Sequence, residues 1–173
     1  MVKSGVDVSA LLDQLQRNPD LWNANTSRTY HPDSPHHEVS DIWVRFNPEK
    51  NCEGTFKEHE SEWYPVIAKV PAAWSIARKI MRMVKGKRLG GILITKVPAG
   101  KSVKPHIDQG WHSRYYEKFA VQIKGNKDQA FCFDGDSLSA EPGDVYTFDN
   151  SKTHWVTNNS DHDRITLIIC IKR

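Results

Sequence analysis

The second half of the chain is a succession of short strand-like segments separated by turn signals, and this pattern restricts the fold more than any other feature. Asp134-Gly135 is typical of a β-hairpin turn, and Pro142-Gly143 of a second tight turn. The final segment is apolar on both faces over residues 165–171, as expected for a strand buried within a two-layered structure. The expected strands cover residues 90–97, 118–124, 129–133, 144–148, 154–157 and 165–172.

Two amphipathic helices are predicted in the first half. Apolar residues recur at the helical period before Pro19, which is expected to end the first helix. Pro71 suits the first position of the second helix, and Gly86 is expected to close it. The apolar stripes consist of Val8, Leu11, Leu12 and Leu15 in the first helix and of Trp74, Ala77, Ile80, Met81 and Val84 in the second.

Residues 23–51 are polar and punctuated by prolines, which indicates loops around one strand at 41–46. The segment 31–38 contains three histidines, and we expect an exposed loop there rather than a metal site. A basic cluster follows the second helix, and we expect it to complement the negative end of the helix dipole in solvent rather than to bind nucleic acid. These histidines are His31, His36 and His37, and the basic residues are Lys85, Lys87 and Arg88.

Helices followed by a run of short antiparallel strands predict an α+β chain. Its core is expected to be a double-stranded β-helix, similar to a jelly roll or a cupin, with the N-terminal helices packed on one sheet. A chain of 173 residues is expected to form a single domain. Within that domain, residues 1–88 form a helical and loop part and residues 89–173 the main β-barrel.

The composition indicates the cellular compartment that we expect for the protein. No stretch reaches the roughly 20 apolar residues of a membrane helix, and the N-terminus lacks the apolar core of a secretory signal. Cys52, Cys132 and Cys170 are few and widely spaced, which argues against a disulfide framework and favours a reducing cytoplasm. The net charge of +3 permits a nucleic-acid partner but does not favour one. We therefore expect a cytoplasmic protein that does not enter a membrane.

Two histidines and one aspartate in the strand-rich half form a candidate metal site. His106 and Asp108 stand two residues apart, so in an extended segment both side chains leave the same face, about 7 Å apart at the backbone. His154 begins a later expected strand. Two imidazoles and one carboxylate occupy one face of an octahedral ion and leave three positions open. This arrangement indicates a non-haem Fe(II) oxygenase, which reacts with O2.

Arg164 stands at the start of the last expected strand. A keto acid bound to iron carries a second carboxylate, to which arginine donates two parallel hydrogen bonds that lysine cannot copy. The polar link 158–161 favours a hairpin turn that would place His154 and Arg164 on neighbouring strands facing one interior. A lone His-x-Asp is common by chance, and His154 or Arg164 alone would suit a core edge or a surface ion pair. The hypothesis therefore depends on all four residues in this order.

Over residues 89–173 the chain resembles the Fe(II)/2-oxoglutarate dioxygenases, and among them the aspartyl/asparaginyl β-hydroxylase-like group. Leu21-Trp-Asn23 and Ile42-Trp-Val-Arg45 are weaker similarities to the same group. The resemblance is carried by Val97-Pro-Ala-Gly-Lys-Ser-Val-Lys-Pro-His-Ile-Asp108, Glu141-Pro-Gly-Asp144, His154-Trp-Val-Thr-Asn158 and Arg164-Ile-Thr-Leu167.

The resemblance implies an Fe(II)- and 2-oxoglutarate-dependent dioxygenase that hydroxylates the side chain of an amino acid or a peptide and releases succinate and CO2. It implies that His106, Asp108 and His154 bind the iron. Arg164 would then pair with the distal carboxylate of 2-oxoglutarate. Thr95 stands where this group often has a hydroxyl near the co-substrate.

The chain departs from that group at two places. The aspartyl/asparaginyl β-hydroxylases proper lack the carboxylate ligand, whereas this chain has Asp108. The group tends to have Arg-x-His on the strand after the first metal histidine, whereas this chain has Lys118-Phe119-Ala120. Lys118 is thus a second candidate cation for the co-substrate, and aspartyl hydroxylation is not carried over.

Two other classes of function fit the same barrel. A cupin-type metal enzyme without 2-oxoglutarate would add a histidine and a glutamate close to the first ligand, and His112 and Glu117 are poorly spaced for this. A non-catalytic binding barrel would use the tryptophans and the basic cluster. A complete triad with an arginine at keto-acid spacing argues against a pure binding protein.

Residues 109–116 directly follow the first two ligands and are expected to form a loop at the mouth of the barrel. The aromatic and mildly basic mouth suits a peptide, a free amino acid or a nucleobase. The family analogy favours the amino acid or peptidyl side chain. The candidate substrate contacts are Trp111, His112, Arg114 and Tyr115 from this loop, with Trp22 and Arg45 from the first half.

Overall fold

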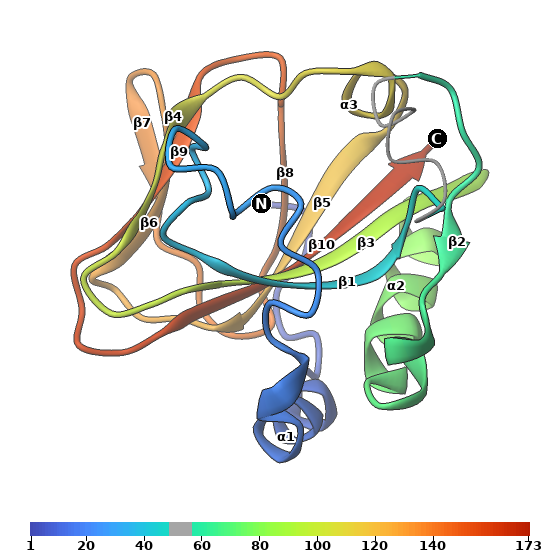
Figure 1. Ribbon diagram of the computed structural model, residues 1–173, viewed down its shortest axis with the longest axis horizontal. Coiled ribbons are helices and arrows are strands. Elements are labelled where there is room, and N and C mark those ends of the chain that lie inside the picture. Colours follow the sequence, from blue (N-terminus) through green and yellow to red (C-terminus); the bar gives the residue numbers. More distant parts are fainter. Residues whose placement is uncertain (49–56) are drawn as a thin grey trace.

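The structure, a computed structural model, describes residues 1–48 and 57–173. Its strands form two antiparallel sheets, and two helices cover the outer face of the larger sheet (Figure 1). This is the α+β architecture with a double-stranded β-helix core that the sequence predicts. Strands β1 and β2 come from the first half of the chain, so the β-structure extends beyond residues 89–173.

The six-stranded sheet has the order β2 (Glu62–Trp63), β1 (Ser40–Phe46), β3 (Arg88–Val97), β10 (Arg164–Lys172), β5 (Glu117–Lys124) and β8 (Val145–Phe148). The four-stranded sheet has the order β4 (Ser102–His106), β9 (His154–Asn158), β6 (Gln129–Phe133) and β7 (Asp136–Leu138). The helices are α1 (Ser9–Arg17), α2 (Pro71–Met83) and α3 (Trp111–Tyr115), and short 3-10 turns cover Pro19–Leu21 and Pro65–Ala68. Every strand that the sequence predicts is present.

Strand β10 lies between β3 and β5, and its two faces meet different surroundings. Leu167 and Ile169 belong to the core beneath the helices. Thr166 and Ile168 instead line the interior between the two sheets. A strand that is covered on both faces contains a nearly continuous run of apolar residues, which explains the composition of β10.

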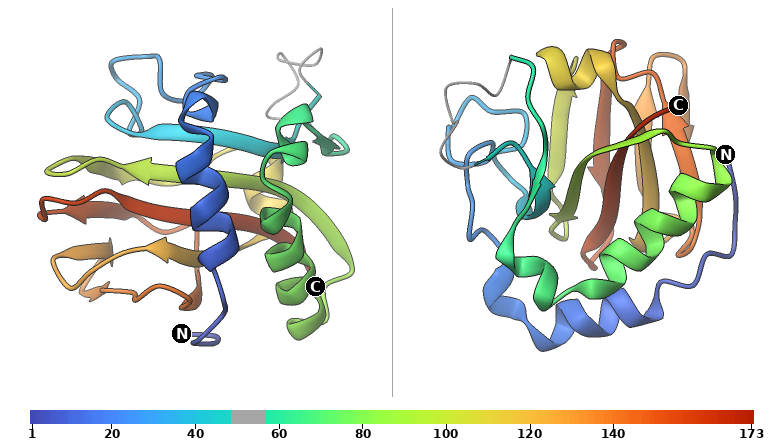
Figure 2. Two further views of the ribbon diagram at one scale, coloured as in Figure 1. Left: turned by 90° about the horizontal axis from the view of Figure 1, so that it is seen from below. Right: turned by 90° about the vertical axis from the view of Figure 1, so that its right-hand side faces the viewer.

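Helices α1 and α2 lie side by side across the six-stranded sheet (Figure 2). Leu11 and Leu15 of α1 are buried there, as the helical period predicts. The stripe predicted for α2 is wrong at Trp74, which is 36% exposed and contacts Trp63 ring to ring. The buried positions of α2 recur instead at a spacing of three and four residues, at Ala73, Ile76, Ala77 and Ile80.

The end of α2 confirms the prediction that the helix closes at Gly86, although a different residue takes the left-handed conformation. Lys85 has φ 54, and its N–H donates to the carbonyl of Arg82 at 3.3 Å. The N–H of Gly86 donates to the carbonyl of Met81 at 2.8 Å, which completes a Schellman motif. Glycine is needed at position 86 because a Cβ there would lie 2.5 Å from Cγ2 of Ile171.

The predicted hairpin is present, with Asp134-Gly135 joining β6 to β7 and Gly135 at φ 82. The loop expected at residues 109–116 is wrong, because five of these residues form helix α3. Aromatic pairs four residues apart stabilise a helical turn, and Trp111 stacks on Tyr115 with ring centroids 4.8 Å apart.

Cys132 and Cys170 are both free and buried, and Cys52 lies outside the described residues. Within residues 1–48 and 57–173, no helix combines the length and the apolar character that crossing a membrane requires.

Candidate metal centre

His106, Asp108 and His154 converge, with one potential ligand atom from each lying within 4.8 Å of the others. His106 ends β4 and His154 begins β9, and the two residues face each other in the strand register. An irregularity between Val103 and His106 sets this alignment, and β4 is an edge strand, where Pro105 removes no hydrogen bond from a neighbour. Asp108 lies just beyond the strand, where its N–H donates to the carbonyl of Asn150 at 3.1 Å.

Each of the two imidazoles is oriented by the backbone carbonyl of the residue two positions before it. Nδ1 of His106 lies 2.8 Å from the carbonyl of Lys104, and Nδ1 of His154 lies 2.9 Å from that of Lys152. A proton on Nδ1 donates to these carbonyls and leaves the lone pair of Nε2 available. The Nε2 atoms lie 3.8 and 3.6 Å from the carboxylate of Asp108. Both imidazoles therefore present the nitrogen that a metal ion requires.

The electrostatics keep the donor atoms in their metal-binding forms. Burial lowers the pKa of His106, which favours the neutral imidazole. Burial raises the pKa of Asp108, but the charge of Lys118 and its hydrogen bond outweigh this effect and hold the pKa below its usual value. Nζ of Lys118 lies 2.5 Å from Oδ2 of Asp108. Two neutral imidazoles and one carboxylate are the donor set of a non-haem Fe(II) site, so the residues fit this metal.

Arg164 is buried and lines a small cavity that the triad also lines. Its guanidinium donates to Oγ1 of Thr166 at 2.7 Å and to Oη of Tyr146 at 2.9 Å. In the part of the chain that the structure describes, no acidic side chain pairs with it. A buried arginine with neutral partners retains the capacity to bind a carboxylate.

The hairpin expected between His154 and Arg164 is wrong, because β9 and β10 belong to different sheets. The chain crosses between the sheets after Asn158, whose amide group donates to the carbonyls of Val97, Pro98 and His162. His154 and Arg164 therefore reach the same cavity from opposite sheets. The polar composition of this link suits a crossing as well as a hairpin.

Thr95 and Lys118, the other two candidates for co-substrate contact, line the same small cavity. Oγ1 of Thr95 donates to Asp41 at 2.9 Å and accepts a hydrogen bond from Arg28 at 2.8 Å. Lys118 is engaged by Asp108. Their contact with a co-substrate stays a prediction.

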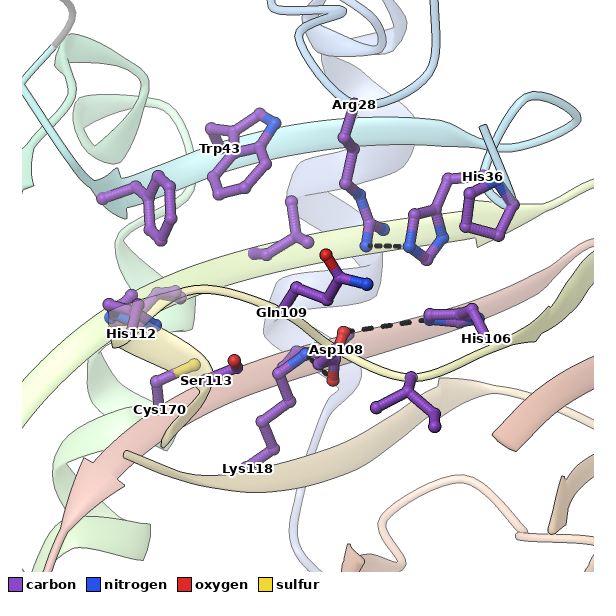
Figure 3. Close-up of a pocket in the computed structure, with 17 residues that line it drawn as sticks. Arg28, His36, Trp43, His106, Asp108, Gln109, His112, Ser113, Lys118 and Cys170 are labelled. Carbon is purple, nitrogen blue, oxygen red and sulfur yellow. Dashed lines mark hydrogen bonds and ion pairs between the residues drawn. The ribbon is translucent and has the colours of Figure 1, made fainter. Parts of the chain in front are cut away.

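A larger cavity of about 590 Å³ is lined by His106 and Asp108 of the triad and by His112 and Ser113 of α3 (Figure 3). Of the predicted substrate contacts, His112 lines it, with Nε2 accepting a hydrogen bond from the N–H of Gly91 at 3.1 Å. The remaining candidates do not line this cavity. Trp111 stacks on Tyr115, Arg114 is exposed, Arg45 donates to the carbonyl of Gly90, and Trp22 packs under the ammonium of Lys96.

Two residues at the site were not predicted from the sequence, Arg28 and His36. Both line the two cavities, and the His36 ring lies edge-on to that of His106 with centroids 4.7 Å apart. The expected exposed loop at 31–38 is therefore wrong at His36 and correct at His31 and His37. One signal pointed to Arg28: Asp41 falls in a strand read as largely apolar, and a buried carboxylate requires a cation.

Comparison with known proteins identifies the family of the chain. The model of the aspartyl/asparaginyl β-hydroxylase family matches residues 10–173. The chain belongs to this family. It is thus a member of a hydroxylase family with a triad that includes the carboxylate Asp108. No curated protein matches the chain.

Comparison with solved structures gives matches over parts of this β-hydroxylase family member. An oxidoreductase of the 2OG-Fe(II) oxygenase family from Burkholderia pseudomallei matches with a TM-score of 0.58 and 10% identity, over 79% of this chain and 69% of that one. A predicted oxalate decarboxylase from Thermotoga maritima matches with a TM-score of 0.40 and 20% identity, over 56% and 74% of the two chains. A cupin domain from Bordetella pertussis matches with a TM-score of 0.40 and 18% identity, over 50% and 85%.

Proposed function

We propose that this β-hydroxylase family member is an Fe(II)- and 2-oxoglutarate-dependent dioxygenase that hydroxylates a C–H bond of an amino acid or a peptidyl side chain. The observation that supports it most is the convergence of His106, Asp108 and His154 beside a cavity that Arg164 also lines. A single keto acid could bind the metal held by the triad and also contact Arg164, because the triad and Arg164 line one cavity.

His106, Asp108 and His154 would hold the metal. Bound Fe(II) would supply the redox chemistry by which O2 converts 2-oxoglutarate to succinate and CO2 and places one oxygen atom in the substrate. Arg164 would bind and orient the distal carboxylate, with Thr166 and Tyr146 fixing the plane of its guanidinium. Phe131, Phe148 and Val156 line the same cavity and exclude water from it.

The cupin-type alternative, a metal enzyme without 2-oxoglutarate, would need a further histidine and a glutamate at the metal. His112 is turned to the backbone of Gly91, and Glu117 pairs with Arg173 at the surface. Among the described residues, the metal-binding group contains His106, Asp108 and His154 alone. The donor set therefore favours the keto-acid enzyme.

The test is an anaerobic titration of the Fe(II)-loaded protein with 2-oxoglutarate, followed by measurement of succinate on admission of O2. We expect saturable binding to the wild type and at least about tenfold weaker binding to Arg164→Lys, because lysine keeps the charge but loses the two parallel hydrogen bonds. Arg17→Met, which changes an exposed arginine on α1, should bind as the wild type does. Iron-loaded protein that binds no keto acid, or an Arg164→Lys variant with unchanged affinity, would refute the proposal.

A further inference from the structure

The larger cavity has no free carboxylate among the described residues that line it. Its lining includes the cations Arg28 and Lys118, whereas Asp108 is the one acidic residue among the described residues that line it. Asp108 is already engaged by Lys118 and would be a metal ligand. No other carboxylate in the lining is available to a cationic substrate.

The sum of formal charges at the site, with Fe(II) and 2-oxoglutarate bound, also favours a negatively charged ligand. The two charges of Fe(II) cancel those of 2-oxoglutarate, Lys118 cancels Asp108, and Arg28 cancels Asp41. Arg164 then leaves one positive charge at the loaded site. A ligand with one negative charge would neutralise it, and burial of charge in a cavity favours such neutrality.

Arg28 is held so that one side of its guanidinium faces the cavity. Nε and Nη2 donate to the two oxygens of Asp41 at 2.5 and 3.0 Å, and Nη2 also donates to Thr95. Asp41 is fully buried behind it, which fixes the guanidinium in place. Nη1 contacts only Nε2 of His36, at 3.3 Å, within the described part of the chain. One N–H of Nη1 is therefore left for a ligand.

His36 holds Nη1 of Arg28 from the side opposite Asp41. Because its Nε2 accepts from Arg28, its proton resides on Nδ1. Nδ1 is buried and has no hydrogen-bond partner among residues 1–48 and 57–173. The two ring nitrogens of an imidazole point in diverging directions, so an acceptor at Nδ1 would lie on the far side of the ring from Arg28. The free N–H of Arg28 is therefore the donor offered to a ligand in the larger cavity.

The remainder of the lining is largely apolar. Trp43 lies on the same side of the cavity as Arg28, and Asp108 and Lys118 lie opposite (Figure 3). Leu93 and Ile168 contribute further apolar surface. A cavity of about 590 Å³ lies within the range that holds small organic ligands.

We propose that the substrate is a small free monocarboxylic acid with an apolar body, whose carboxylate is received by the free N–H of Arg28. The apolar body lies against Trp43 and Leu93, which line the same cavity. This inference rests on the proposed function, because it assigns Arg164 to 2-oxoglutarate. It distinguishes a free acid from a residue within a peptide chain.

Binding, measured without turnover, tests the inference. The protein is loaded with Zn(II), saturated with 2-oxoglutarate and titrated with 3-phenylpropanoate, 3-phenylpropanamide and N-acetylphenylalaninamide while amide chemical shifts are followed. We expect the acid to bind about tenfold or more tightly than the isosteric amide, the contribution of a charge-assisted hydrogen bond. Equal binding of the acid and the amide, or tighter binding of the capped peptide mimic, would overturn the inference.

The double variant Arg28→Met with Asp41→Asn removes the cation without leaving a buried carboxylate unpaired, and should abolish the preference for the acid. The matched control is Arg17→Met with Asp13→Asn, which removes an exposed ion pair and should keep the preference. The titrations are repeated without 2-oxoglutarate. Failure of the keto acid to bind counts against the proposed function, whereas an acid preference that survives in the Arg28 double variant counts against this inference alone.

Discussion

Nζ of Lys118 donates to Oδ2 of Asp108 at 2.5 Å, so the one carboxylate of the metal triad carries its own cation. Both side chains are largely buried, with 17% and 14% of their surfaces exposed. The ammonium competes with a divalent metal for the carboxylate and also repels it. It thereby limits the affinity of the site for metal while keeping Asp108 ionised.

Replacement of Lys118 by methionine is expected to increase the affinity for Mn(II) at pH 8 by about tenfold, because a divalent ion no longer meets a positive charge at the carboxylate. Lys118→Arg keeps the charge and should stay close to the wild type. Calorimetric titration with Mn(II) measures both. Weaker binding by the methionine variant would mean that the ammonium orients the carboxylate for the metal instead of competing with it.

The stability of the fold is expected to fall in mild acid because of His112. Burial, with a smaller contribution from His59, lowers the pKa of His112 to about 3. The unfolded chain takes up a proton near pH 6.5 and the folded chain does not, so stability is complete above pH 6.5 and is lost as the pH falls toward 3. The loss from this group is about 1.4 kcal/mol per pH unit.

Urea unfolding between pH 7 and pH 5 of the wild type and of His112→Gln isolates this contribution. Glutamine cannot titrate but can still accept the hydrogen bond from Gly91. The free energy of unfolding should therefore depend less steeply on pH in the variant. Identical slopes would show that His112 is protonated in the folded protein.

The sequence predicts those parts of the site that lie on regular strands. His154 falls on an expected strand, whereas β4, which ends at His106, was not among the expected strands. His106 was identified by its spacing and order with Asp108 and His154. Arg164 was found by the same reasoning, although the pairing of its strand was wrong. A turn sequence specifies that the chain reverses its direction. It does not specify which sheet the following strand joins.

The residues that the sequence did not reveal are held by contacts distant in the chain. Arg28 bonds to Thr95 across 67 positions, and the loop that carries Arg28 and His36 has no periodic pattern. Loop placement depends on the folded sheets beneath it, which local propensity does not specify. Asp41 was the only local sign of a buried cation nearby.

Tyr146→Phe should lower the stability of the ligand-free protein by about 1–3 kcal/mol, because it leaves a buried N–H of Arg164 without its acceptor. Bound 2-oxoglutarate would supply a new acceptor, so the keto acid should raise the melting temperature of this variant more than that of the wild type. Thermal unfolding of the Zn(II)-loaded protein with and without 2-oxoglutarate measures this. Tyr30→Phe, at an exposed tyrosine, is the control. Equal ligand shifts in Tyr146→Phe and the wild type would argue against keto-acid binding at Arg164.

The closure of α2 provides a paired test of backbone and packing effects. Gly86→Ala should destabilise the fold by about 1–3 kcal/mol, because the added Cβ would meet Ile171 at 2.5 Å and Sδ of Met81 at 2.8 Å. Lys85→Gly, one residue earlier, should instead stabilise it by up to about 1 kcal/mol, because glycine adopts φ 54 without the strain that a side chain imposes. Urea unfolding of both variants measures the two effects. A loss of stability in Lys85→Gly comparable to that in Gly86→Ala would mean that the aliphatic part of the lysine side chain, and not the conformation of its backbone, determines how this helix ends.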